Sequence, residues 1–195
     1  MNQIHQNLCA VTITVSILMS LFTGTYLVAA SPSDVPVKAV HKEIFVNAVP
    51  ESVWAAWTTP AGVKSFFAPA CNVKLETNGP YEILFFPDSE PGSRGAEDCT
   101  VLAYQLNRMF SFTWSAPPQY PDIRKQRTAV VIRLFPAPSG KTRVTLTQTG
   151  WGEGGNWDRT YEYFTEAWER VLFRLKVRFE KGAVDWSNPP NPPAQ

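Results

Sequence analysis

A change of periodicity near residue 150 limits the possible folds more than any other feature of the chain. Before it, residues 142–149 alternate between polar and apolar in the manner of a half-buried β-strand. After it, from Trp157 to Lys181, apolar side chains recur at helical spacing. This apolar stripe consists of Trp157, Tyr161, Phe164, Trp168, Val171, Leu172, Leu175 and Phe179. A long amphipathic helix must bury such a stripe, so the sequence predicts an α+β fold in which this helix packs on the preceding strands.

The chain before that point contains short β-forming runs separated by turn residues. A first strand is expected at 38–48, followed by two short helices that begin at Pro50 and Pro60. Further strands are expected at 72–76, 81–86, 97–104, 109–114, 127–135 and 141–149. Their short connections favour an antiparallel meander. The Pro- and Gly-rich loops at 88–95 and 116–122 are long enough to border a binding site.

Two of these runs show which face of the sheet is apolar. Arg127 and Arg133 share one face of the strand at 127–135, so its apolar residues occupy the other face. Lys141 and Arg143 leave the same pattern in the next strand. The run around Val101 is apolar on both faces, and its pattern gives no orientation.

The loop GWGEGGNW at 150–157 matches the dinucleotide-binding pattern G-x-G-x-x-G. Such a site also needs a second parallel strand after the helix, with an acidic residue at its end for the ribose. Here the helix is followed only by Gly182, Asp185 and a proline-rich tail. We therefore interpret the match as coincidental. The glycines are expected to serve backbone angles and close packing, with Gly152 at a positive φ.

The first thirty residues have the composition of an export signal. Residues 8–30 carry no charged side chain, and Val28 to Ala30 supply small residues for a cleavage site, although the segment before residue 10 lacks Lys and Arg. We expect a cleaved signal at 1–30, a linker at 31–36, and a periplasmic or secreted protein. An uncleaved, membrane-anchored form is the alternative, since the run is long enough to span a bilayer.

Composition excludes several kinds of function. With 195 residues, 44% hydrophobic content and a net charge of +1, the chain suits one domain with a substantial core and is a poor partner for nucleic acid. His41 is the one histidine after residue 30, so a histidine-rich metal site cannot form. It is expected to be a surface residue at the start of the first strand, and we therefore expect no Ser-His-Asp triad. Cys71 and Cys99 do not have zinc spacing, and an intervening strand is expected to keep them too far apart for a disulfide. We expect no catalytic residue, no metal, no cofactor, and a monomer.

Several short motifs together resemble a known superfamily. They are PESVWAAWT at 50–58, GPYEI at 79–83, FTW at 112–114, QRT at 126–128, and GWG at 150–152 followed by Trp157, Tyr161, Tyr163, Phe164, Ala167, Trp168, Val171 and Leu172. In this order they resemble the SRPBCC (START-like) superfamily, nearest to the branch related to the C-terminal domain of the activator of heat-shock-protein-90 ATPase. The resemblance covers residues 37–186 and leaves a Pro-rich tail at 187–195.

The resemblance implies the helix-grip fold, a curved antiparallel sheet wrapped around the long C-terminal helix with a cavity between them. Members use this cavity for lipids, hormones, polyketides and other apolar molecules. Combined with the alternation above, it predicts a small apolar or aromatic ligand. The expected contacts are Tyr81, Ile83, Phe85, Phe112, Trp114, Val130, Ile132, Trp151, Tyr161, Phe164 and Trp168.

Two other functions stay open alongside simple ligand binding. A cyclase or dehydratase acting in the same cavity would need a proton donor or acceptor, and the candidates are Glu82, Asp98, Tyr104, Arg127 and Tyr161. A co-chaperone of the ATPase-activator type requires that the N-terminal segment is not a signal. The motif by which relatives would contact a chaperone is not identifiable in this chain, and most relatives of this branch lack an export signal.

Overall fold

The computed structural model describes residues 37–193, which begin with strand β1 (Val40–Val46). Helices α1 (Pro50–Thr58) and α2 (Pro60–Lys64) follow directly. Each begins at a proline, whose fixed φ and missing N–H suit the first helical position. The Thr59 hydroxyl caps α2 by accepting a hydrogen bond from the Gly62 N–H at 3.0 Å. Both predicted helices are confirmed.

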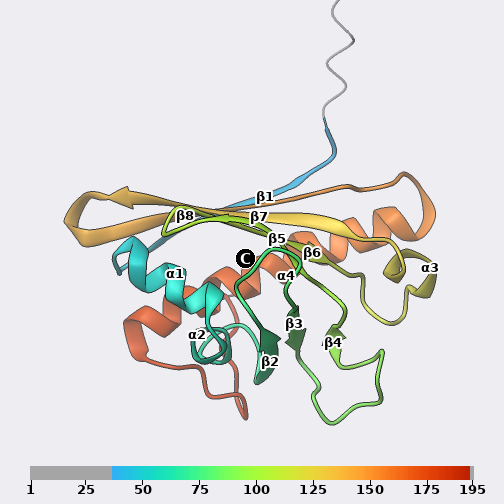
Figure 1. Cartoon of the computed structure of the whole chain (residues 1–195), viewed down its shortest axis with the longest axis horizontal. Coiled ribbons are helices and arrows are strands. Elements are labelled where there is room, and N and C mark those ends of the chain that lie inside the picture. Colours follow the sequence, from blue (N-terminus) through green and yellow to red (C-terminus); the bar gives the residue numbers. More distant parts are fainter. Residues whose placement is uncertain (1–36, 194–195) are drawn as a thin grey trace, which may run out of the picture. The chain divides into compact units, whose positions relative to one another are not determined.

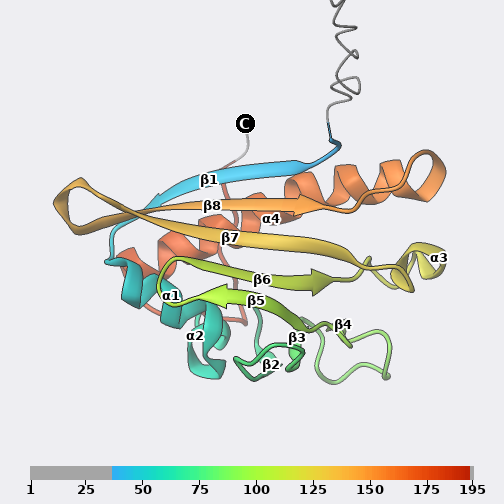
Figure 2. The same ribbon diagram turned by 45° about the horizontal axis from the view of Figure 1, so that its top comes forward.

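Five antiparallel strands form the main sheet in the order β1-β8-β7-β6-β5 (Figure 2). The four strands that follow one another in the chain form the predicted meander, and β1 joins it by pairing with the last strand. Their bounds are β5 (Val101–Gln105), β6 (Met109–Trp114), β7 (Thr128–Ala137) and β8 (Lys141–Thr149). A short 3₁₀ turn, η1 (Pro138–Gly140), connects β7 to β8, and the short helix α3 (Pro121–Arg124) precedes β7.

The remaining strands form a second, smaller sheet, β2 (Ala70–Val73), β3 (Tyr81–Leu84) and β4 (Gly95–Ala96). The sequence predicted one strand at 97–104, but the structure places β4 before it and starts β5 only at Val101. Backbone hydrogen bonds link the two sheets, because the Val101 N–H donates to the Gly79 carbonyl at 2.9 Å and the Tyr81 N–H to the Cys99 carbonyl at 2.7 Å. The small sheet therefore continues into the main sheet, and together they form the predicted curved sheet.

The long helix α4 (Gly155–Lys181) lies along one face of the main sheet, with α1, α2 and the small sheet on the same side (Figure 1). Its predicted stripe forms the contact. The members Phe164, Trp168, Val171, Leu172 and Leu175 are buried, and Trp157, Tyr161 and Phe179 at the two ends are half-buried. The α+β helix-grip fold is thus confirmed.

The predicted apolar faces also form the core. Val130, Ile132 and Leu134 of β7 and Val144 and Leu146 of β8 are buried. In β5 only the first residue is buried and the next four are exposed, an orientation that the sequence pattern did not indicate.

Gln148 is a buried polar residue that joins the sheet to α4. Its side-chain oxygen accepts a hydrogen bond from Trp168 Nε1 at 2.6 Å, and its Nε2 donates to Thr128 Oγ1 at 2.8 Å. These bonds satisfy both ends of an amide that is fully buried, as burial of polar groups requires.

The glycine loop before α4 contains one correction. Gly150, Gly154 and Gly155 have positive φ values of 89°, 72° and 53°, but Gly152 does not. The prediction of a positive φ at Gly152 is wrong. Position 152 requires glycine for a steric reason, since a Cβ at this position would lie 2.3 Å from Trp157 Nε1. The helix that follows is the last regular element, so the structure contains no second parallel strand for a dinucleotide within residues 37–193.

After α4 the chain turns back and packs on α2. The Val184 N–H donates to the Ser65 carbonyl at 2.9 Å, and Trp186 Nε1 donates to the Lys64 carbonyl at 2.7 Å. The predicted signal (1–30) and linker (31–36) lie outside the described residues, as do the last two residues of the predicted tail. Within residues 37–193, no helix is long and apolar enough to cross a membrane.

Candidate ligand-binding site

Three adjoining pockets open between α4, the end of β3 and the loops that follow it. Phe85 and Tyr163 line all three, so the pockets are parts of one depression. The first, bordered by the two predicted rim loops, has a volume of about 380 Å³. The second extends along α4 toward Trp186 and has a volume of about 400 Å³. A small recess of about 40 Å³ connects them to the core beside Trp168. We call the first the rim pocket and the second the helix pocket.

Five aromatic side chains form part of the wall of the rim pocket. Trp114, at the end of β6, and Phe164, on α4, form its inner side, and Phe86 and Tyr163 lie at its mouth, 66% and 39% exposed. The border is completed by Ser93, Gly95, Ala96, Arg124 and residues 115–119, which confirms that both Pro- and Gly-rich loops border a pocket. Exposed aromatic groups around a concave apolar surface are typical of small-molecule sites.

The inner wall is held rigidly by aromatic packing. The Trp114 ring stacks on Phe67 with centroids 5.6 Å apart and lies 5.1 Å from Trp168. Phe85 and Phe164 meet its edge or face at 6.5 Å. Trp114 is only 3% exposed, so its position is fixed by core contacts on several sides.

Two polar atoms in this wall have no hydrogen-bond partner among residues 37–193. They are Trp114 Nε1 and Ser115 Oγ, in side chains that are 3% and 4% exposed. Beside Ser115, burial raises the pKa of the Cys99 thiol, which therefore stays neutral. A buried N–H without an acceptor costs about 1–3 kcal/mol.

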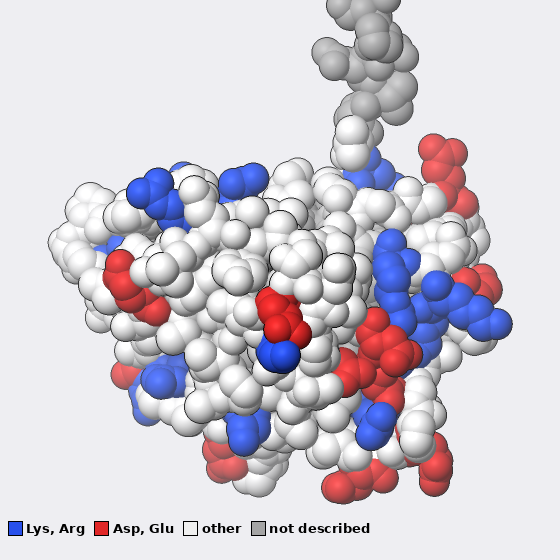
Figure 3. Space-filling view, in the orientation of Figure 1, with Lys and Arg blue, Asp and Glu red and all other residues white. Residues whose placement is uncertain are grey.

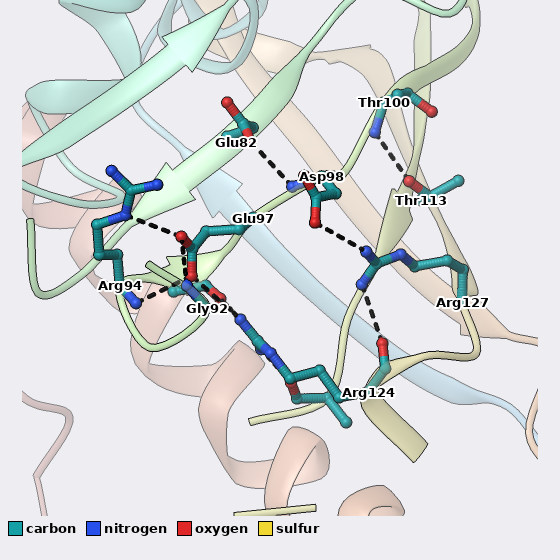
Figure 4. A network of polar contacts seen from close by, with 11 residues as sticks. Glu82, Gly92, Arg94, Glu97, Asp98, Thr100, Thr113, Arg124 and Arg127 are labelled. Carbon is teal, nitrogen blue, oxygen red and sulfur yellow. Dashed lines mark hydrogen bonds and ion pairs between the residues drawn. The ribbon is translucent and has the colours of Figure 1, made fainter. Parts of the chain in front are cut away.

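A buried carboxylate ties the rim loops together (Figure 4). Glu97 accepts hydrogen bonds from the backbone N–H groups of Gly92 and Arg94 at 2.9 and 3.0 Å and from Arg94 Nε at 2.8 Å. Arg124 reaches the same carboxylate at 3.4 Å and donates to the Gly95 and Ala116 carbonyls at 2.7 and 2.5 Å. Over the region of α3 and β4, acidic and basic side chains lie next to each other in Figure 3.

These contacts set the charge state of Glu97. Burial by itself raises the pKa of the carboxyl, but the hydrogen bonds from Gly92 and Arg94 and the charge of Arg94 lower it more, so the pKa lies below its ordinary value. Glu97 is therefore ionised at neutral pH and holds both rim loops. No sequence spacing relates residue 97 to residue 124, and the sequence analysis missed both.

The predicted ligand contacts divide into three groups in the structure. Phe85, Trp114, Phe164 and Trp168 line the depression. Trp151 and Tyr161 pack on each other at 5.2 Å, and the Tyr161 hydroxyl donates to the Ala39 carbonyl at 3.0 Å. The third group is buried in the interior of the sheet and consists of Tyr81, Ile83, Phe112, Val130 and Ile132.

Tyr81 shows the environment of that interior group. Its hydroxyl donates to the Trp57 carbonyl at 2.9 Å, and burial raises its pKa well above the ordinary value. Contact between the interior group and a ligand stays a prediction. The sequence analysis missed Phe86 and Tyr163, because Phe86 ends a strand run and Tyr163 lies off the apolar stripe of α4.

The candidate proton donors and acceptors lie outside the depression. Glu82 accepts from the Asp98 N–H at 2.9 Å, and Arg127 lies 3.9 Å from the Asp98 carboxylate, so these three form a surface cluster (Figure 4). Tyr104 packs on Trp54 at 6.3 Å. Neither these four nor Tyr161 lines the three pockets.

No group of potential metal ligands occurs within residues 37–193. His41 is exposed on β1, and its Nδ1 lies 3.0 Å from Thr147 Oγ1. Cys71 and Cys99 are both free thiols, as predicted, because β3 lies between the segments that carry them.

A larger pocket of about 560 Å³ lies at the opposite end of the main sheet. The β5–β6 turn, β7 and the start of α1 enclose it, and Glu51, Arg108 and Arg133 are part of its wall. It lacks the aromatic wall and the tied loops of the depression beside α4. We therefore place the candidate site at the depression, although its individual pockets are smaller.

The family follows from comparison with known proteins. The family model described as Activator of Hsp90 ATPase homolog 1-like protein matches residues 47–180. The chain belongs to this family. No curated protein is significantly similar to this family member in sequence.

Solved structures show the same fold. Protein MLL2253 from Mesorhizobium loti is 24% identical with a TM-score of 0.60, and the match covers 75% of this chain and 100% of that one. The Aha1 dimer from Colwellia psychrerythraea is 20% identical with a TM-score of 0.56, covering 75% and 98% of the two chains. CalU16 from Micromonospora echinospora is 16% identical with a TM-score of 0.56, covering 76% and 78%. At these identities the likeness supports the fold of this Hsp90-activator-like chain and no particular activity.

Proposed function

We propose that the protein is an exported binding protein for a small apolar or aromatic molecule, which it holds in the depression between α4, β3 and the rim loops. The observation that carries this proposal is the rim pocket. It combines an aromatic wall, a volume within the range of ligand sites, and a buried indole N–H without a partner among residues 37–193. The fold family of the protein, which includes ligand-binding and polyketide cyclase-like proteins, is consistent with this proposal.

The walls of the depression are held in place by specific contacts, which supports a binding site and not an incidental hollow of the surface. The Glu97–Arg124 pair fixes both loops at the mouth, and stacking on Phe67 and Trp168 fixes Trp114. A pocket whose walls are already in place loses little conformational entropy when a ligand enters. The ligand then replaces water at the exposed rings of Phe86 and Tyr163.

Binding is tested with the neutral dye N-phenyl-1-naphthylamine, whose fluorescence rises in apolar surroundings. We expect saturable binding that falls at least fivefold in Tyr163→Ala, because Tyr163 lines all three pockets. Phe45→Ala is the matched control, since Phe45 is an exposed aromatic residue on β1 outside these pockets. Equal loss in both variants, or no binding of this dye or of any other neutral apolar probe to the wild type, would refute the proposal.

Export is a separate part of the proposal and depends on the N-terminal sequence. The uncharged run at 8–30 and the small residues at 28–30 support cleavage near Ser31. N-terminal sequencing of protein from the native host is expected to begin at or near Ser31, in a fraction outside the cytoplasm. Soluble cytoplasmic protein that begins at Met1 or Asn2 would contradict export and would favour the co-chaperone alternative.

A further inference from the structure

The helix pocket has two arginines in its wall and no carboxylate. Arg170 and Arg174 lie one helical turn apart on α4, and both line this pocket. The rest of the wall consists of Pro69, Phe85, Phe86, Tyr163, Ala167, Val171, Trp186 and Pro189. Two positive charges thus border a surface that is otherwise almost entirely apolar.

Neither guanidinium is neutralised effectively within residues 37–193. The nearest acidic group to Arg170 is Glu166, with 3.9 Å between NH1 and Oε2, and the Glu166 side chain is 78% exposed. Such an exposed pair contributes little. Arg174 has an uncharged partner, because its Nε donates to the Pro190 carbonyl at 3.2 Å, and its guanidinium lies 5.7 Å from the centre of the Trp186 ring.

The electrostatics of Arg174 favour a bound anion. Burial lowers the pKa of its guanidinium, and the positive charge of Arg170 lowers it further. Both effects disfavour the charged form of Arg174. An anion placed between the guanidinium groups of Arg170 and Arg174 would offset the repulsion between them. The planar guanidinium also matches a carboxylate, which can accept two parallel hydrogen bonds.

We propose that the ligand is an apolar carboxylic acid whose carboxylate binds Arg170 and Arg174 while its hydrocarbon part lies in the rim pocket. The two pockets share Phe85, Phe86 and Tyr163, so one molecule can extend along these rings from one to the other. A single negative charge fits better than a phosphate, because transfer of a doubly charged group to such an apolar wall is more costly. This inference rests on the proposed function and adds the class of ligand.

The experiment compares 2-naphthoate with its methyl ester, which lacks the negative charge and adds one methyl group, by isothermal titration calorimetry at pH 7 and low salt. We expect the acid to bind at least tenfold more tightly than the ester, and the preference to fall at 0.5 M salt, since ion pairs near the surface are screened. The double variant Arg170→Gln, Arg174→Gln should bind both probes equally. Decanoate and decanol form a second pair, which distinguishes chain-like from ring-like acids.

Arg159→Gln is the matched control, because it removes the same charge from an exposed position on α4 outside the pocket. It should keep the acid preference. If the double variant does not fold, Arg174→Lys replaces it in the experiment. This variant retains the positive charge and should keep part of the preference for the acid. Ester binding equal to acid binding in the wild type would refute this inference and leave the proposed function standing. Failure of all four probes to bind would also refute this inference, and the dye experiment then decides separately whether the proposed function stands.

Discussion

Replacement of Gly152 by alanine tests why the loop before α4 contains this glycine. A Cβ at this position would lie 2.3 Å from Trp157 Nε1 and 2.6 Å from its Cδ1. Non-bonded heavy atoms of this kind normally stay about 3.5 Å or more apart, so the indole must move by about 1 Å. Overpacking of this size costs about 1–3 kcal/mol of the free energy of unfolding. Because Trp157 is half-buried at the start of α4, we expect the lower part of that range.

A double-mutant cycle separates this clash from a backbone effect. Urea unfolding followed by circular dichroism gives the free energy of unfolding of Gly152→Ala with Trp157 present and with Trp157→Ala. The alanine should be destabilising only when the indole is present. Without it, the change should be neutral or stabilising by up to about 1 kcal/mol, because alanine restricts the unfolded chain more than glycine does.

Gly150→Ala is the control for backbone strain. Gly150 has a φ of 89°, and a Cβ there would have no heavy atom closer than 3.5 Å. Its cost, about 1–3 kcal/mol for a strained backbone, should therefore be the same with and without Trp157. If Gly152→Ala cost the same in both backgrounds, the steric explanation would be wrong and the backbone conformation would be the cause.

Three further predictions concern the rim, the core and the thiols. Glu97→Gln should lower the free energy of unfolding by about 1–3 kcal/mol at pH 7. Because the folded pKa of Glu97 is depressed, its contribution is complete above the ordinary value of 4.5 and is lost as the pH falls through the folded pKa. Urea titrations should show the difference from wild type closing in acid, and a constant difference down to pH 3 would contradict this. Gln148→Leu should cost about 1–3 kcal/mol, because the buried N–H of Trp168 loses its acceptor, and an unchanged urea midpoint would exclude this role. Iodoacetamide followed by peptide mapping should label half-buried Cys71 well before buried Cys99, and equal rates would count against the described packing.

Local patterns in the sequence were sufficient for the elements and their faces. The prolines at positions 50 and 60 marked the starts of α1 and α2, because proline suits a helix start and disrupts an interior. Alternation in β7 and β8 and the helical stripe around Trp168 indicated the buried faces, because side-chain direction follows from the backbone period. These are properties of a few neighbouring residues, which the sequence contains in full.

Only the tertiary structure decided the site. The closure of the rim joins Glu97 to Arg124, and the helix pocket brings Phe86 and Trp186 to Arg174, contacts between residues far apart in the chain. The same applies to β5, whose run is apolar on both faces, and to Gly152, whose neighbour in space is an indole ring. Periodicity shows that a face is buried but not what packs against it. The division of the aromatic residues between a filled interior and an open pocket therefore depends on how the sheet curves and where α4 crosses it, which is determined by packing across the whole domain.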